Sequence, residues 1–354
     1  MTSSLLTITN DWFYDLTRFT ERPYGDKQKD LPNVYENLIY NPSEGIITSR
    51  VTGRKLKYGS FETLNVNEIN NRVGFNTPKW RLYGDCKVST VVADVTDLHM
   101  DPANAGRVFQ VASQFNALEM VGPKVKPSDG ITRYSSDHTQ GPACAMACGA
   151  GTLYRNYYLQ TDDTQLNMAD EMLDKFPAPR YQRGYTYENG YLFLQGDMIS
   201  NLLWHQRGIQ YPFNKIRVGV QRNTQVTLLG CEHNVTQVYC SALPLAYHEQ
   251  KSYFAELPLH TAGQYVLESA YKSTLGVAIE NNQQHDIPEV YLTLLGGGAF
   301  GNRIDHIMQA ITDALKPMLK GNGLDIKIVC YTTDIQQMVD TFLEKLVLPK
   351  YLNL

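Results

Sequence analysis

The chain of 354 residues lacks any run of about 18 consecutive apolar residues, which is the shortest run that forms a membrane-spanning helix. Residues 1–14 also lack the basic flank and the long apolar core of a secretory signal. A formal charge of only −4, from 32 basic and 36 acidic residues, gives no overall field that would attract nucleic acid or an anionic membrane. We therefore expect a soluble, monomeric protein for which neither a membrane nor a nucleic acid is the partner.

Metal-binding and disulfide patterns are missing as well. The eight histidines show no ligand spacing, and Cys144 and Cys148 lack two further ligands that could complete a zinc site. The six cysteines are spread over the chain in mostly apolar contexts, which is typical of reduced, buried thiols. These features predict a protein without metal or cofactor in the cytosol, although secretion by a route without a classical signal stays open.

The distribution of polar and apolar residues indicates two unequal parts. Residues 1–80 are polar, rich in Asn and Tyr and interrupted by turn signals, and they predict an irregular or small α+β extension without chemistry of its own. Residues 81–354 predict one α/β domain, with a polar insertion at about 160–210 and a hairpin turn at Asn189-Gly190.

Apolar periodicity supplies the elements of the α/β domain. It predicts strands at 87–95, 107–112, 215–220, 225–229, 235–242, 290–295 and 324–331, and helices at 143–158, 261–281, 303–315 and 334–346. The alternation in the last third of the chain implies a sheet covered by helices on both faces. Ligands of such folds lie at the carboxyl ends of the strands.

A glycine-rich loop follows the strand predicted at 290–295. Residues 296–302 read Gly-Gly-Gly-Ala-Phe-Gly-Asn and lead directly into the helix predicted at 303–315. Glycines let backbone amides approach a phosphate without a Cβ in the way, and a helix N-terminus adds a partial positive charge. The spacing fits neither a Walker loop nor the dinucleotide fingerprint. It therefore indicates a phosphate-bearing ligand, while a tight turn without a ligand remains the alternative.

The order of these segments resembles a macrodomain, the fold that binds ADP-ribose. Residues 92–98 resemble the strand end whose acidic residue, here Asp94 followed by Val95, accepts a hydrogen bond from the adenine amino group. The loop resembles the diphosphate loop, and the strand ending at Tyr331 resembles the closing strand of the adenine pocket. The resemblance implies a three-layer α/β/α mixed sheet, with ADP-ribose bound by the loop residues Gly297, Gly298, Ala299, Phe300, Gly301 and Asn302.

The stretch after the second predicted strand departs from macrodomain hydrolases, because residues 110–119 contain no glycine run. The resemblance here is closer to divergent macrodomain hydrolases of bacterial effectors, which implies a protein delivered into a host cytosol or an ordinary cytoplasmic one. It implies Ser113, Asn116 and Gln140 as further substrate contacts. The predicted substrate is an ADP-ribosylated protein.

Carboxylates suit cleavage of the bond at the ribose anomeric carbon, because the transition state is cation-like and water must be oriented. Glu119 is our first candidate, and Asp129 and Asp137 in the following loop are secondary ones that could hold an arginine guanidinium. An ordinary helix-starting Asn116, a first-turn Glu119 and turn-forming aspartates explain the same residues without catalysis.

Three functions remain open from the sequence. The first is an ADP-ribosylhydrolase that releases ADP-ribose from modified side chains, with arginine as a candidate linkage. The second is a module that binds ADP-ribose without chemistry, and the missing glycine run favours it. The third is a thiol-dependent hydrolase that uses Cys144 or Cys148.

Overall fold

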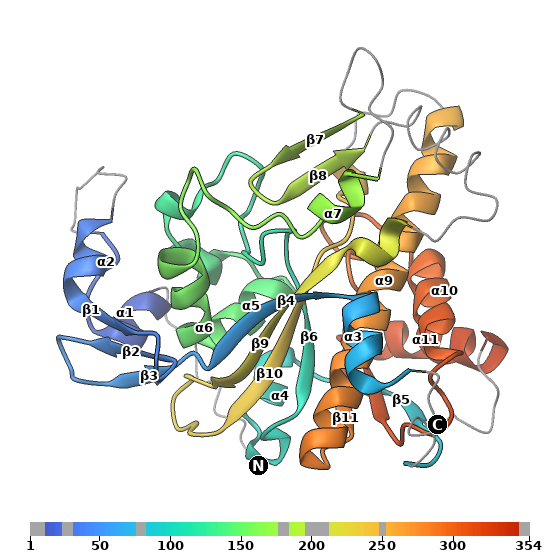
Figure 1. The fold of residues 1–354 in the computed structure, drawn as a ribbon, viewed down its shortest axis with the longest axis horizontal. Helices are drawn as coiled ribbons and strands as arrows, with labels where there is room; N and C mark the ends of the chain where they lie inside the picture. The colour runs from blue at the N-terminus through green and yellow to red at the C-terminus, as the bar shows by residue number, and fades with distance from the viewer. Residues whose placement is uncertain are drawn as a thin grey trace.

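A computed structural model describes residues 11–22, 31–75, 83–175, 184–194, 212–247 and 253–346. Its centre is a seven-stranded sheet with the strand order β4-β9-β10-β6-β11-β12-β5 (Figure 1). The strands are β4 (Ser60–Asn65), β5 (Lys87–Val92), β6 (Val108–Ala112), β9 (Arg217–Gln225), β10 (Asn234–Cys240), β11 (Glu289–Leu292) and β12 (Asp325–Cys330).

Strand direction decides where a site can form. The five strands from β10 to β5 are mutually parallel, whereas β9 runs antiparallel to both β10 and β4. The carboxyl ends of the five parallel strands therefore meet at one edge of the sheet, where open α/β sheets bind their ligands. Loops 93–94, 113–120, 241–244, 293–303 and 331–332 leave the sheet at this edge.

Helices cover both faces of the sheet, which confirms the predicted three-layer α/β/α arrangement with a mixed sheet. One face packs against α3 (Val66–Val73), α9 (Tyr253–His285), α10 (Ile304–Leu315) and α11 (Thr333–Leu346). The other face packs against α4 (Val95–Met100), α5 (Gln140–Ala147) and α6 (Gly149–Leu153). Strand β6 shows the alternation, because Val108 lies in the first core and Phe109 and Val111 lie on the opposite face.

The amino-terminal part forms a separate small layer beside α6. It comprises α1 (Trp12–Thr17), α2 (Pro32–Asn37) and an antiparallel sheet of β1 (Leu38–Asn41), β2 (Ile46–Ser49) and β3 (Lys55–Lys57). Stacked rings join it to the domain: Tyr58 on Tyr154 and Tyr40 on Tyr158, each with centroids 4.4 Å apart. Residues 60–73 of the expected extension instead supply β4 and α3 to the central layers.

The expected insertion carries a hairpin and a short helix. Strands β7 (Tyr185–Glu188) and β8 (Tyr191–Leu194) pair across Asn189 and Gly190, whose positive φ angles of 44° and 88° confirm the predicted turn. Helix α7 (Asp170–Leu173) precedes them. The remaining elements are the 3₁₀ turns η2 (Pro102–Asn104), η3 (Pro127–Asp129), η4 (Thr132–Ser136), η6 (Pro212–Lys215) and η7 (Leu245–Tyr247), and the π-helix η5 (Tyr154–Tyr158).

Two predictions of elements are wrong in instructive ways. Residues 225–229 form no strand of their own, because β9 continues through the polar Arg222, whose guanidinium pairs with Glu62 and Glu280. The helix expected at 143–158 begins at Gln140 and breaks at Cys148. Thr227 causes this break, since its hydroxyl accepts the Gly149 amide and its own amide donates to the Ala147 carbonyl.

Candidate functional site

The glycine loop lies where the sequence places it, between β11 and α10 at the carboxyl edge of the sheet (Figure 1). Gly296 and Gly301 adopt left-handed φ angles of 74° and 68°, which disfavour residues with a Cβ. Asn302 links the two ends of the loop. Its Nδ2 donates to the Leu243 carbonyl at 2.9 Å, and its backbone N–H donates to the Gly296 carbonyl at 2.9 Å. Asn302 is therefore a brace of the loop, with only 5% of its surface exposed.

Three consecutive amides of the loop are available to a ligand. The N–H groups of Gly298, Ala299 and Phe300 donate to no residue within the described part of the chain. Gly298 and Ala299 are exposed, and a Cβ placed on Gly298 would meet nothing within 4 Å. Successive free amides in a turn form the concave donor set that binds anions.

The first turn of α10 contributes less to this cradle than the sequence implied. The helix begins at Ile304, and its first turn holds Asp305, whose Oδ1 accepts the His306 amide at 3.1 Å. Arg303 pairs with the same carboxylate at 2.9 Å. Because Asp305 already complements the helix N-terminus, the donors for an anion come from the loop.

Glu119 lies on the loop that follows β6 and is 4% exposed. Its Oε1 has no hydrogen-bond partner among the described residues, and its Oε2 lies against Gly141 at the start of α5, where a Cβ would clash with the carboxylate. Burial raises the pKa of Glu119 well above its usual range; Arg155 opposes the shift and Asp137 adds to it. This environment favours the protonated form of the Glu119 carboxyl relative to an exposed glutamate.

The two secondary carboxylates have different surroundings. Asp137 lies close enough to Glu119 to raise its pKa, but its Oδ1 already accepts the amide and the hydroxyl of Thr139 at 2.9 and 2.7 Å. Asp129 is exposed and closes η3 by accepting the Lys126 amide at 2.9 Å. No interaction within the described residues connects Asp129 with Glu119, so the structure does not bring Asp129 into the site.

The residues expected at the adenine side lie on the ends of two neighbouring strands. Asp94 lies exposed at the end of β5 and caps α4 by accepting the Thr96 amide at 2.6 Å, while Val95 behind it is buried. Tyr331 is 71% exposed at the end of the neighbouring strand β12. The Ala93 amide donates to the Cys330 carbonyl at 3.1 Å, which fixes the two strand ends side by side.

The three polar residues expected to contact substrate are already engaged in internal hydrogen bonds. Ser113 is buried and donates to the Gln114 carbonyl at 3.0 Å. Asn116 is fully buried, accepts the Leu118 amide at 3.1 Å and donates to Gln165 at 2.8 Å. The Oε1 of Gln140 accepts the backbone amide of Ala112, and its Nε2 donates to the backbone carbonyl of Gln110, so this side chain ties α5 to β6.

An aromatic group that the sequence did not predict connects the glycine loop with the region of Glu119. The rings of Tyr191 and Tyr247 contact Phe300 with centroids 5.6 and 6.0 Å apart, and they are 6.0 Å from one another. The Tyr191 hydroxyl donates to the Met120 carbonyl at 2.6 Å. Burial raises the pKa of Tyr191, with smaller contributions from Tyr247, Glu119 and Asp137, so these groups share one region. The Asn189-Gly190 turn located the hairpin, but no sequence signal gave its packing partner.

Arg155 is a second residue that sequence reasoning did not find. It is 1% exposed, its Nε donates to the Ala117 carbonyl at 2.9 Å, and its guanidinium lies 3.7 Å over the Tyr239 ring. Ala117 has a φ of 58°, two residues before Glu119. Arg155 therefore holds the strained backbone that delivers Glu119.

The thiols are unsuited to nucleophilic chemistry in this arrangement. Cys144 and Cys148 are fully buried, and burial raises the pKa of both thiols. Within the described residues, no three His, Cys, Asp or Glu side chains come together as a metal site. None of the described helices has the length and apolar character needed to cross a membrane.

Comparison with known proteins gives a likeness of structure only. No protein-family profile matches the sequence, and no curated protein matches it. Among solved structures, the chain is similar to poly(ADP-ribose) glycohydrolase from Thermomonospora curvata bound to the inhibitor ADP-HPD, with a TM-score of 0.46 and 11% identity over 90% of this chain and 96% of that chain. It is also similar to poly(ADP-ribose) glycohydrolase from Deinococcus radiodurans in complex with ADP-ribose, with a TM-score of 0.45 and 10% identity over 81% of this chain and 94% of that chain.

Proposed function

We propose that this protein binds ADP-ribose at the carboxyl edge of its sheet and hydrolyses the bond that links the ribose to a modified protein side chain. The observation that carries the proposal is the set of free amides at Gly298, Ala299 and Phe300, which lies in one region with the buried carboxyl of Glu119. A cradle of backbone donors suits a diphosphate, and a carboxyl without a partner suits proton transfer.

Glu119 supplies the proton in this proposal. Its raised pKa favours the neutral carboxyl, which is the form that can donate to a leaving oxygen or nitrogen. As the bond from the anomeric carbon to the side chain breaks, the proton of Glu119 passes to the leaving atom. Water then adds to the anomeric carbon, and its released proton restores the Glu119 carboxyl. The products are free ADP-ribose and the unmodified side chain.

An arginine linkage is the side-chain type that we propose first. Asp137 lies within electrostatic reach of Glu119 and is partly exposed, so a guanidinium leaving group would find negative charge beside the proton donor. At the other end, the exposed Asp94 and Tyr331 on neighbouring strand ends suit the adenine amino group and ring.

A release assay tests the enzyme directly. Arginine-linked and glutamate-linked ADP-ribosylated proteins are incubated with the wild type, with Glu119→Gln and with Glu188→Gln, a matched change at an exposed position of β7. We expect free ADP-ribose from the wild type and from Glu188→Gln, and a loss of at least about a hundredfold with Glu119→Gln. Absence of release from every linkage removes the enzyme proposal.

A module that binds ADP-ribose without chemistry is the second candidate. It is favoured by Asn116, which is fully buried and engaged, and by the absence of a glycine run in the loop after β6. Calorimetry with ADP-ribose separates the two candidates. Equal binding by the wild type and Glu119→Gln, with no release by either protein, favours the binding module.

A further inference from the structure

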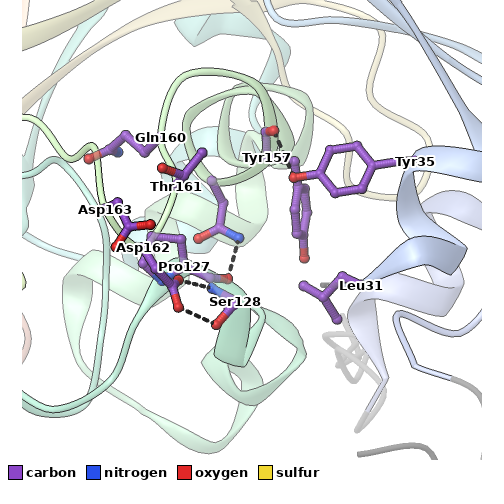
Figure 2. A pocket seen from close by; sticks show the side chains of 10 residues that line it. Leu31, Tyr35, Pro127, Ser128, Tyr157, Gln160, Thr161, Asp162 and Asp163 are labelled. Carbon is purple, nitrogen blue, oxygen red and sulfur yellow. Dashed lines mark hydrogen bonds between the residues drawn. The ribbon is translucent and has the colours of Figure 1, made fainter. Parts of the chain in front are cut away.

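A cavity of about 300 Å³ opens on the side of the molecule where the amino-terminal layer meets the central domain (Figure 2). Its wall combines α2, η3, the π-helix η5 and the loop that follows it. The lining residues that matter here are Tyr35, Ser128, Asn156, Tyr157, Asp162 and Asp163. None of them belongs to the candidate site described above, and the volume suits a group of side-chain size rather than a nucleotide.

Carboxylates and carbonyl oxygens dominate the polar groups of this wall. Asp162 accepts the amide and the hydroxyl of Ser128 at 3.0 and 2.8 Å (Figure 2), and each carboxylate oxygen keeps a lone pair. Asp163 is exposed and makes no hydrogen bond or ion pair with any described residue. None of the lining residues is basic, although Arg22 donates to the Ser128 carbonyl from outside the lining. The wall is therefore negative and rich in acceptors.

Asn156 adds a buried acceptor without a partner. This lining residue is 1% exposed, its Nδ2 donates to the Pro127 carbonyl at 3.1 Å, and its Oδ1 has no hydrogen-bond partner in the described structure. The Pro127 carbonyl fixes the orientation of the amide, because a flipped side chain would set two oxygens against one another. A buried amide oxygen without a donor costs free energy, so this part of the cavity wall is incompletely satisfied.

The backbone that carries Asn156 is itself unusual. Residues Tyr154–Tyr158 form a π-helix, a conformation that is rare and frequent at functional sites. Tyr157 from this turn and Tyr35 from α2 line the cavity with their rings edge to face and 6.3 Å between centroids (Figure 2). Burial and then the charge of Asp162 raise the pKa of Tyr35, so the aromatic wall and the carboxylate act on the same space.

We propose that this cavity binds a guanidinium group, either of a free small molecule or of an arginine side chain in a peptide. A guanidinium is planar and presents several N–H donors, so it can pair with the carboxylates of Asp162 and Asp163 while it stacks on a tyrosine ring. A neutral ligand leaves the two carboxylates without a counter-charge. A compact ammonium offers no flat face to Tyr35 and Tyr157.

Calorimetry on the full chain tests the proposal with n-propylguanidinium, its neutral isostere n-propylurea and n-butylammonium. We expect saturable heat with n-propylguanidinium, no binding of the urea and at least about fivefold weaker binding of the ammonium. An acetylated Gly-Arg-Gly amide separates the two sources. Binding as tight as that of n-propylguanidinium assigns the cavity to a peptide side chain, and exclusion of the peptide assigns it to a free molecule.

Charge variants complete the test. Asp163→Asn removes a carboxylate that has no partner among the described residues, and we expect at least about tenfold weaker binding of n-propylguanidinium with unchanged thermal unfolding. Asp174→Asn, an exposed matched change outside the cavity, keeps wild-type affinity. Absence of heat with n-propylguanidinium, equal binding of n-propylurea, unchanged binding by Asp163→Asn, or competition by ADP-ribose overturns the proposal. None of these measurements requires hydrolase activity.

Discussion

Gly298 offers the sharpest test of the phosphate cradle, because a side chain fits there in the free protein. A Cβ at this position meets nothing within 4 Å, and the residue has none of the left-handed φ values found at Gly296 and Gly301. Gly298→Asp and Gly298→Asn therefore fold alike and stay within about 0.5 kcal/mol of the wild-type free energy of unfolding. The two variants differ in one negative charge placed beside the amides of residues 298–300.

The expected effect follows from the distance between charges. A carboxylate on residue 298 would lie roughly 6 Å from a phosphate held by the neighbouring amides, which costs about 0.7 kcal/mol at the dielectric constant of water and about 3 kcal/mol at an effective value of 20. Gly298→Asp should therefore bind ADP-ribose about 3- to 150-fold more weakly than Gly298→Asn. Because Gly298 is exposed, the gap should shrink in about 1 M salt.

Isothermal titration with ADP-ribose at low and high salt measures both quantities, and thermal unfolding of each variant supplies the control for folding. ADP-ribose binding at wild-type affinity by both variants, with no dependence on salt, would refute a phosphate at this loop. Equal weakening by Asp and Asn would show a steric effect without a nearby negative charge. That result would also contradict the cradle.

Three further predictions concern Glu119, Gly301 and His99. The raised pKa of Glu119 means that the folded protein keeps a proton that the unfolded chain releases above its ordinary pKa of 4.5. The contribution of Glu119 to stability therefore falls as pH rises, by up to about 1.4 kcal/mol per pH unit until the folded-state pKa is reached. Denaturant titrations from pH 5 to pH 8 should show that Glu119→Gln reduces this loss, and an unchanged slope would contradict burial of the carboxyl. Gly301→Ala should lower the free energy of unfolding by about 1–3 kcal/mol, because its φ is 68° and the new Cβ would lie 2.8 Å from the Cβ of Ala246; unchanged thermal unfolding would refute this conformation. Burial lowers the pKa of His99 to about 4 from an ordinary 6.5, so the contribution of His99 to the free energy of unfolding should fall by about 3 kcal/mol as pH falls through this window. The difference in stability between the wild type and His99→Gln should therefore shift against the wild type as pH falls, and a shift in the opposite direction would overturn the assignment.

Local patterns predicted the elements that carry the phosphate cradle. The run of apolar residues before Gly296 and the apolar stripe after Arg303 located β11 and α10 to within three residues at each boundary. The strand over 107–112 appears as Val108–Ala112, and the Asn189-Gly190 turn appears as predicted. These features depend on short-range sterics and on the burial period of one element, which neighbouring residues specify.

The sequence did not predict which polar side chains would form hydrogen bonds within the protein. Asn116 and Asn302 look like ligand residues in the chain, yet Asn116 accepts a backbone amide of its own loop and Asn302 donates to the Leu243 carbonyl of a neighbouring loop. Asp129 looks like a catalytic carboxylate and closes a 3₁₀ turn. Their roles depend on backbone dihedrals of loops, for which apolar periodicity carries no information.

By itself, the sequence determined a mixed α/β architecture and an exposed glycine loop at the end of a buried strand, because glycine content and apolar period act over a few residues. Only the tertiary structure decided that Glu119 is buried with no partner for Oε1 among the described residues, that Tyr191 contacts the loop residue Phe300, and that Arg155 supports the backbone before Glu119. These relationships join residues that are 38 to 109 positions apart, from Ala117 to Arg155 and from Tyr191 to Phe300. The packing of strands and helices from the whole chain creates them, and no local pattern encodes that packing.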